Sequence, residues 1–288
     1  MRLVEAELVS RAMAAATALA AGLGLQVDDV VIVHNSNKLA LRLLPCDVFA
    51  RVAVRGPAVA ALEVEFARRL AATASPVAAL EPRVEPRIYE RDGFTVTFWT
   101  YYQSVAPGPN SSAAYADALH RLHIGLRRVD IETPHFQDGA AEAERLVAQR
   151  HETPTLAEPD RYLLLSTLKD SGERIRSRGA AEQLLHGEPH PGNLLRTHGG
   201  LLFIDFETCC RGPIEFDVAH APDEVTAHYP DLDDLLLQEC RRLVLAMVAA
   251  WRWDVRDEFP NGRQHGRDLL TLLRQGPPWP APGPLTAT

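Results

Sequence analysis

The distribution of hydrophobic residues divides the chain into a strand-rich first third and a helix-rich remainder. Between residues 30 and 101, short runs of apolar and β-branched residues alternate with turn-forming residues such as Asn, Asp and Gly. From residue 102 onward, apolar residues recur mainly at intervals of three and four, the spacing that gathers them on one face of a helix. The pattern predicts an α+β fold, with a small antiparallel sheet first and a larger helical region after it.

The predicted elements follow from these runs. The expected strands are Val30–Val33, Lys38–Leu44, Val48–Val54, Arg87–Tyr89 and Phe94–Tyr101, and the expected helices cover residues 3–21, 58–74, 113–126, 140–151, 159–184, 231–253 and 266–274. The first three strands would form a meander, and Arg91-Asp92-Gly93 is typical of a hairpin turn. A further short hairpin, Asn193–Arg196 with Leu201–Asp205, interrupts the helical part.

We expect three regions along the chain. Residues 1–100 would form an N-terminal lobe, and residues 101–274 a helical C-terminal lobe. Residues 275–288 are rich in Pro and Gly, a composition typical of disorder.

Composition excludes several classes of protein. The 288 residues are 46% hydrophobic and 24% charged, as in ordinary globular proteins. The net charge of -8 argues against a nucleic-acid partner, whose phosphates require a basic face. No run reaches the ~20 apolar residues of a membrane span, and the apolar stretch Met13–Gly24 follows acidic residues, unlike a signal peptide. The four cysteines form no C-x-x-C pair, which fits a cytoplasmic location.

The most informative segment is His186–Leu195, HGEPHPGNLL, followed by Leu201–Glu207, LLFIDFE. Phosphoryl transfer requires a metal ion held against the phosphates and a positioned nucleophile. Asn193 and Asp205 offer the hard oxygen ligands that Mg²⁺ prefers. Glu188 offers a carboxylate that could accept or orient a hydroxyl proton.

This segment resembles the H-G-D-x-x-x-x-N and I-D-F/W-E motifs of the aminoglycoside phosphotransferase and choline kinase-like family. The matching residues are His186-Gly187-Glu188 with Asn193, and Ile204-Asp205-Phe206-Glu207. The resemblance implies a two-lobed protein-kinase-like fold that binds ATP and Mg²⁺. It also implies transfer of a phosphoryl group to a hydroxyl of a small molecule.

The resemblance extends outward over about residues 25–255 and assigns further site residues. It places Ser36 and Asn37 in the turn that covers the nucleotide. Arg51 on the third strand would be the phosphate-binding cation, with Glu63 on the next helix as its partner. Trp99 and Tyr101 would lie in the hinge that meets the adenine, and Asp217 would support the loop from behind. Asn193 and Asp205 would hold the metal, and Glu188 would act on the acceptor hydroxyl.

Three departures from the family pattern stand out. Glu188 replaces the catalytic Asp, and its extra methylene displaces the carboxylate by roughly an ångström, an error that can cost ~100-fold in rate. The third strand has no Lys, so Arg51 must hold the phosphates there. The chain has no G-x-G-x-x-G loop, and residues 34–38 would cover the phosphates instead.

Several alternatives stay open at the level of sequence. Glu65 competes with Glu63 as the helix carboxylate, and His123 fits a structural role at a helix end. Because of Glu188, the chain could be a nucleotide-binding pseudo-enzyme that acts as a sensor or scaffold. A third possibility is an unrelated helical binding protein in which the motif arose by chance.

Overall fold

The computed structural model describes residues 6–35, 38–54, 57–106 and 111–283 and divides the chain into two compact units. Unit 1 comprises Met1–Ala106 with Leu195–Glu207, and unit 2 comprises Pro107–Leu194 with Thr208–Thr288. The units therefore follow a different division from the expected boundary at residue 100, because a segment late in the sequence folds with the N-terminal part.

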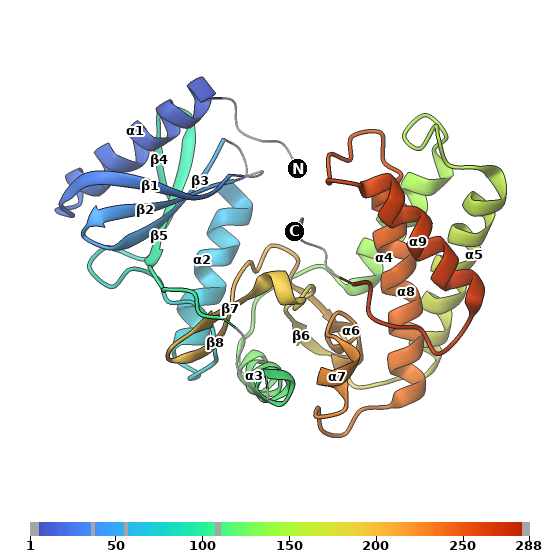
Figure 1. Cartoon of the computed structure of the whole chain (residues 1–288). Coiled ribbons are helices and arrows are strands. Elements are labelled where there is room, and N and C mark those ends of the chain that lie inside the picture. Colours follow the sequence, from blue (N-terminus) through green and yellow to red (C-terminus); the bar gives the residue numbers. More distant parts are fainter. Residues whose placement is uncertain (1–5, 36–37, 55–56, 107–110, 284–288) are drawn as a thin grey trace. The chain divides into compact units, whose positions relative to one another are not determined.

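Unit 1 is built on a five-stranded antiparallel sheet in the order β1-β2-β3-β5-β4 (Figure 1). Its elements are α1 (Ala6–Gly22), β1 (Val27–Asn35), β2 (Leu39–Pro45), β3 (Val48–Ala53), α2 (Pro57–Ala71), β4 (Tyr89–Arg91) and β5 (Phe94–Thr100). Asp92 and Gly93 both have positive φ, at 51° and 82°, as the predicted hairpin turn between β4 and β5 requires.

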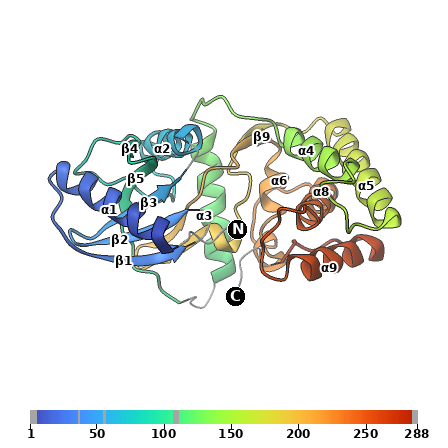
Figure 2. The same ribbon diagram turned by 90° about the horizontal axis from the view of Figure 1, so that it is seen from above.

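Alternation of side chains gives the sheet two different faces. In β2 and β3, the residues Leu39, Leu41, Val48, Ala50 and Val52 are almost fully buried, while the residues between them are half-buried. The buried set packs against α1, whose inner face consists of alanines that let the helix lie close to the strands (Figure 2). The half-buried set faces the opposite side, where the candidate site residues lie.

The late segment of unit 1, Leu195–Glu207, contains most of a short hairpin of β7 (Leu194–Thr197) and β8 (Gly200–Phe203). Strand β8 ends at Phe203, whose backbone N–H donates to the Pro76 carbonyl at 2.8 Å and whose carbonyl accepts from Ala78 at 3.1 Å. These bonds attach residues 204–207 to the segment that follows α2, so that the chain passes directly by that helix.

Unit 2 is mainly helical. Its elements are α3 (Ser111–Leu126), α4 (Phe136–Ala148), α5 (Glu158–Ser177), β6 (Gln183–Leu185), the 3₁₀ turn Pro191–Asn193, β9 (Cys210–Gly212), α6 (Ile214–Val218), α7 (Asp223–Thr226), α8 (Asp234–Arg252) and α9 (Gly262–Gln275). Helix α8 is buried along most of its length and packs against α4, α5, α6 and α9 (Figure 1). Strands β6 and β9 pair antiparallel and frame the loop that carries Glu188.

The observed elements differ from the expected ones at several places. Strands β6 and β9 and helices α6 and α7 were not expected, and β4 begins at Tyr89, where the expected strand ended. The helix expected over residues 159–184 ends at Ser177, because Gln183–Leu185 pairs with β9 instead. Of the expected disordered tail, residues 275–283 are described, and Trp279 packs on α8 with its backbone N–H donating to Gln238 Oε1 at 2.6 Å. Within the described ranges, no helix is both long and apolar enough to cross a bilayer.

Candidate functional site

The predicted site residues form two groups, one in each unit. Unit 1 contains Arg51, Glu63, Trp99, Tyr101 and Asp205, and unit 2 contains Glu188 and Asn193. Ser36 and Asn37 lie outside the described residues.

An ion pair between β3 and α2 forms the centre of the unit 1 group. Arg51 Nη1 lies 2.5 Å from Glu63 Oε1, and the Glu63 side chain is only 3% exposed. Glu65, the competing carboxylate on the same helix, faces solvent and pairs with Arg68 and Arg69 at 2.8 and 2.5 Å. Because Glu63 lies on the buried face of α2, its carboxylate requires a cation, and Arg51 provides one.

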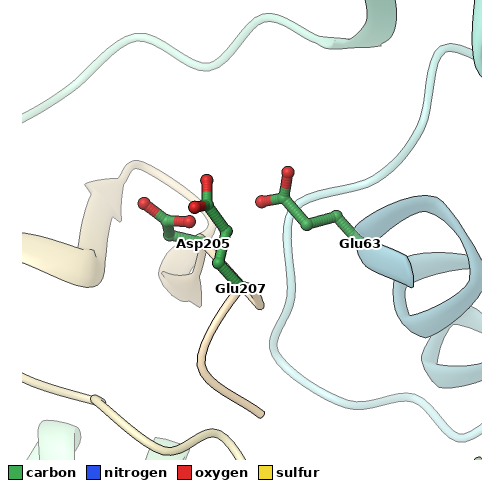
Figure 3. Close-up of side chains that lie close together, drawn as sticks. All are labelled: Glu63, Asp205 and Glu207. Carbon is green, nitrogen blue, oxygen red and sulfur yellow. The ribbon is translucent and has the colours of Figure 1, made fainter. Parts of the chain in front are cut away.

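Two further carboxylates lie beside this pair. Oxygens of Glu63, Asp205 and Glu207 lie within 4.8 Å of one another, and Figure 3 shows the three carboxylates close together. Phe206 is buried and stacks on Phe66 of α2, with ring centroids 5.9 Å apart and planes 11° apart. This stacking anchors the segment to the helix that also carries Glu63. Asp205 has a φ of 70°, a left-handed conformation that is uncommon outside Gly and recurs at functional sites.

A second cation, Lys38, completes the cluster. Lys38 Nζ lies 3.0 Å from Glu63 Oε2 and also contacts Glu207 Oε1. Arg51 Nη2 lies 3.4 Å from both Asp205 Oδ1 and Glu207 Oε1. Each oxygen of Glu63 therefore has its own cation, and Asp205, at 36% side-chain exposure, is the most open of the three carboxylates.

The charges in this cluster shift one another's protonation in opposite directions. Burial opposes the charge on Arg51, but the carboxylates of Glu63 and Asp205 outweigh it and raise the pKa of Arg51. Burial and the neighbouring Arg51 charge lower the pKa of Lys38, although Glu63 and Asp205 partly offset them. Lys38 is therefore deprotonated more easily than Arg51.

Trp99 and Tyr101 lie at the end of β5. Arg51 is opposite Thr97 in the β3–β5 pairing, so the side chains of Arg51, Thr97 and Trp99 share one face of the sheet. Trp99 is buried, and its Nε1–H donates to Thr97 Oγ1 at 2.9 Å. Tyr101 is half-buried, and its ring lies 4.0 Å from the guanidinium carbon of Arg42. Both residues lie in the segment expected to meet the base, a role that stays a prediction.

In unit 2, a fully buried carboxylate holds the start of the loop that carries Glu188. Asp217 accepts hydrogen bonds from the backbone N–H of His186 at 2.9 Å and of Gly187 at 2.8 Å. His123 Nε2 lies 2.9 Å from Asp217 Oδ2, and His123 Nδ1 lies 2.6 Å from the Tyr229 hydroxyl. Burial alone would raise the pKa of Asp217, but the hydrogen bonds from His123 and from the His186 backbone outweigh it and lower that pKa.

The tautomer of His123 follows from its two partners. Burial and the Asp217 charge raise the pKa of Tyr229, so its hydroxyl keeps its proton. The hydroxyl therefore donates to Nδ1, and Nε2–H donates to the Asp217 carboxylate. His123 is a buried bridge between α3 and the Asp217 site, more specific than the helix-end role expected from its position.

The rest of the loop is fixed by polar contacts to its backbone. The Tyr115 hydroxyl donates to the Pro189 carbonyl. The Glu188 carbonyl accepts from His190 N–H at 2.8 Å and from Asn193 Nδ2 at 3.0 Å. Because the Asn193 nitrogen binds the loop, its amide oxygen keeps its acceptor capacity. Glu188 itself is half-buried.

Gly187 is required at its position. Its φ is 92°, and a Cβ there would lie 1.9 Å from the Thr208 carbonyl oxygen. Only glycine combines this conformation with so close an approach of two backbones.

Sequence reasoning assigned no site role to Glu207 or Tyr115, and it placed Lys38 only within the segment 34–38 expected to cover the phosphates. A signal existed for Glu207, which lies two residues beyond Asp205 in the same short segment. For Lys38, the even spacing from Ala40 places it on the Arg51 side of the sheet, since Ala40 pairs with Arg51. Tyr115 lies 74 residues from its partner, and no local pattern marks that contact.

Comparisons with known proteins identify a family and a set of similar folds. The model of the phosphotransferase enzyme family matches residues 28–241. No curated protein matches the chain. Among solved structures, the amicoumacin kinase hAmiN in complex with AMP-PNP, Ca²⁺ and Ami has a TM-score of 0.70 at 12% identity, over 96% of this chain and 98% of that chain.

Two further structures are similar over most of their length. The GDP and kanamycin complex of APH(2")-IIia has a TM-score of 0.67 at 16% identity, over 87% of this chain and 94% of that chain. A choline/ethanolamine kinase family protein from Mesorhizobium loti has a TM-score of 0.65 at 15% identity, over 87% and 90%. These likenesses confirm the predicted α+β, protein-kinase-like fold, and the family match covers most of the chain. The chain belongs to the phosphotransferase enzyme family.

Proposed function

We propose that this protein is a small-molecule kinase that transfers the γ-phosphoryl group of ATP to a hydroxyl, with Mg²⁺ as its metal ion. The observation that carries the proposal is the unit 1 cluster, in which buried Glu63 holds Arg51 beside the Asp205 carboxylate. The similar structures with bound AMP-PNP or GDP support a nucleotide as the donor. ATP is the proposed donor, with GTP as the alternative to be tested.

The donor atoms of the site fit a magnesium ion. Mg²⁺ requires hard oxygen ligands, and Asp205 would supply the most exposed carboxylate of the cluster. Both oxygens of Glu63 already bind cations, so Asp205 and the amide oxygen of Asn193 are the proposed metal ligands. A bound magnesium ion would neutralise charge on the phosphates of the nucleotide.

The chain's own residues would supply positioning and charge. Arg51, oriented by Glu63, would hold phosphate oxygens, and a guanidinium can do so in a two-pronged contact. Ser36 and Asn37 would cover the phosphates, and Trp99 and Tyr101 would border the base. Glu188 would orient the acceptor hydroxyl and accept its proton. The bonds from Asp217, Tyr115 and Asn193 hold the Glu188 loop in place before any ligand arrives.

The acceptor is proposed only as a hydroxyl-bearing small molecule, with no nucleic acid or membrane involved. Substrate contacts would come from residues 140–184 and 224–274 of unit 2. A cytoplasmic location stays a prediction from the sequence.

A substrate panel with purified variants tests the proposal. Release of nucleoside diphosphate from Mg-ATP and Mg-GTP would be measured against amino sugars, amino alcohols and antibiotics. Asp205→Ala should abolish turnover, and Glu188→Gln should lower kcat by ~100-fold or more while nucleotide binding persists. Asp130→Ala and Glu85→Gln, at exposed positions outside the proposed site, are the matched controls.

Two outcomes would overturn the assignment. Full activity of Asp205→Ala would show that the metal site is elsewhere. Nucleotide binding without turnover, by the wild type and by Glu188→Asp across the whole panel, would identify a sensor or scaffold instead of an enzyme.

A further inference from the structure

The position of Lys38 is unusual for a chain so poor in lysine. Lys38 and Lys169 are its only two lysines, and Lys169 lies exposed on α5. Lys38 immediately precedes β2, and its side chain is only 15% exposed. It shares the buried Glu63 carboxylate with Arg51, one cation to each oxygen.

The cluster carries more negative than positive charge, so it can bind a further anion only if one of its cations contacts that anion. Glu63, Asp205 and Glu207 carry three negative charges, and Lys38 and Arg51 carry two positive ones. The polyphosphate of a nucleotide would meet a net negative site unless a cation turns toward it. Arg51 touches all three carboxylates, so its guanidinium is the more constrained of the two cations.

Lys38 is suited to exchange partners. An ammonium group is a compact charge with three donors on a flexible stem, so it can keep Glu63 and replace Glu207 by a phosphate oxygen with little movement. Glu207 is 27% exposed and so can be rehydrated when Lys38 leaves it. Glu63, at 3% exposure, cannot be rehydrated and must retain its cations.

We propose that Lys38 is a second phosphate-binding cation, anchored by Glu63 beside Arg51, which exchanges Glu207 for a phosphate of the bound nucleotide. Lys38, immediately before β2, would thereby add a second phosphate-binding cation to Arg51 of β3. The inference rests on the proposed nucleotide site. The rival explanation is that Lys38 merely neutralises Glu207.

The test measures the affinity of a phosphate series by calorimetry, in EDTA so that no metal contributes. Adenosine, AMP, ADP and ATP would be titrated into the wild type, Lys38→Met, Lys38→Arg and the control Lys169→Met. One lost charge-assisted hydrogen bond corresponds to ~10- to 100-fold. Lys38→Met should weaken ADP and ATP by that factor and leave adenosine unchanged, Lys38→Arg should recover part of the loss, and Lys169→Met should match the wild type.

A second pair of variants separates phosphate binding from neutralisation of Glu207. Glu207→Gln alone should tighten ADP binding, because it removes a negative charge. If Lys38 binds phosphate, Lys38→Met with Glu207→Gln will bind ADP at least ~10-fold more weakly than Glu207→Gln alone. Equal affinities of these two variants would overturn the inference, since neutralisation would then be the only role of Lys38.

The two proposals fail in different ways. A wild type that binds nucleotide with the same affinity as Lys38→Met refutes the role of Lys38 and leaves the kinase assignment intact. A wild type that binds no nucleotide, with or without Mg²⁺, refutes both. Circular dichroism of each variant confirms that the fold is retained.

Discussion

Replacing Asp217 by Asn tests whether one buried carboxylate organises the Glu188 loop. Asp217 accepts from His123, His186 N–H and Gly187 N–H at 2.8–2.9 Å and is fully buried. An amide keeps one acceptor oxygen and turns the other position into a donor. The NH₂ group would replace Oδ1, which faces only Gly187, because replacing Oδ2 would oppose two donors.

The expected loss of stability follows from this arrangement. The Gly187 N–H is left without an acceptor inside the protein, which costs about 1–3 kcal/mol. The two remaining bonds lose the charge of their acceptor, at about 1 kcal/mol each. Asn is easier to bury than an ionised Asp, which offsets part of the sum. Asp217→Asn should therefore lower the free energy of unfolding by about 2–4 kcal/mol.

Urea denaturation followed by tryptophan fluorescence measures this loss. Trp251, Trp253 and Trp279 lie in unit 2 and only Trp99 in unit 1, so the signal reports mainly on the unit that contains Asp217. Asp130→Asn is the control, because that side chain is 98% exposed and its loss should stay within about 0.5 kcal/mol. A loss below 1 kcal/mol for Asp217→Asn would refute the three-bond arrangement.

Two further predictions concern the same unit. Gly187→Ala should lower the free energy of unfolding by about 2–4 kcal/mol in the same urea assay, because the new Cβ would meet the Thr208 carbonyl at a positive φ. Gly172→Ala on α5, where nothing lies within 4 Å of the new Cβ, should instead be stabilising. No change in stability for Gly187→Ala would contradict the close approach of the two backbones. Burial lowers the pKa of His220 from 6.5 to about 3, so below pH 6.5 the unfolded state binds a proton that the folded state does not. The free energy of unfolding should therefore fall by about 2 kcal/mol between pH 7.5 and pH 5. His220→Leu should not show this loss. Asp217 contributes in a different pH range: because its pKa is lowered in the folded state, stability is lost only as the pH falls below 3.8, the ordinary pKa of Asp. If the unfolding free energy of the wild type and of His220→Leu changes equally with pH above 3.8, the assignment to His220 is refuted.

Local pattern was sufficient to predict most of the sheet and the main helices. Leu39, Leu41 and Leu43 alternate with less buried residues, so β2 was recognisable from its period of two. Helix α2 was recognisable from the three- and four-residue spacing that buries Phe66 and Leu70. In both elements the same residues that set the pattern also form the core.

Elements that depend on distant partners escaped prediction. Strand β6 has three residues and exists because it pairs with β9 about 27 residues later, which no local period can reveal. The tail around Trp279 has the composition of a disordered segment, yet it packs on α8 through Gln238 and Arg241. Pairing and docking of this kind override local propensity.

The site divides in the same way. The spacing of Glu188, Asn193 and Asp205 was enough to predict phosphoryl-transfer chemistry, because these residues lie close together in the sequence. The burial of Glu63, and thus its choice over Glu65, depended on which face of α2 packs inward. The contact of Lys38 with Glu63 crosses 25 residues and a change of element, so only the folded chain could provide it.

The fixed loop also determines how the Glu188 substitution should be interpreted. The bonds that hold the loop run through its backbone, including the Glu188 carbonyl, which accepts from His190 and Asn193. The loop is therefore expected to keep its place whether Asp or Glu stands at position 188, and the longer Glu side chain carries its carboxylate roughly an ångström farther from the loop backbone. In an enzyme adapted to that reach, the acceptor hydroxyl lies correspondingly farther from the loop, and Glu188→Asp should lower kcat by ~10- to 100-fold. In an enzyme weakened by the substitution, the same change should raise kcat. Whether Glu188→Asp lowers or raises kcat thus distinguishes a site adapted to glutamate from a site in which glutamate impairs catalysis.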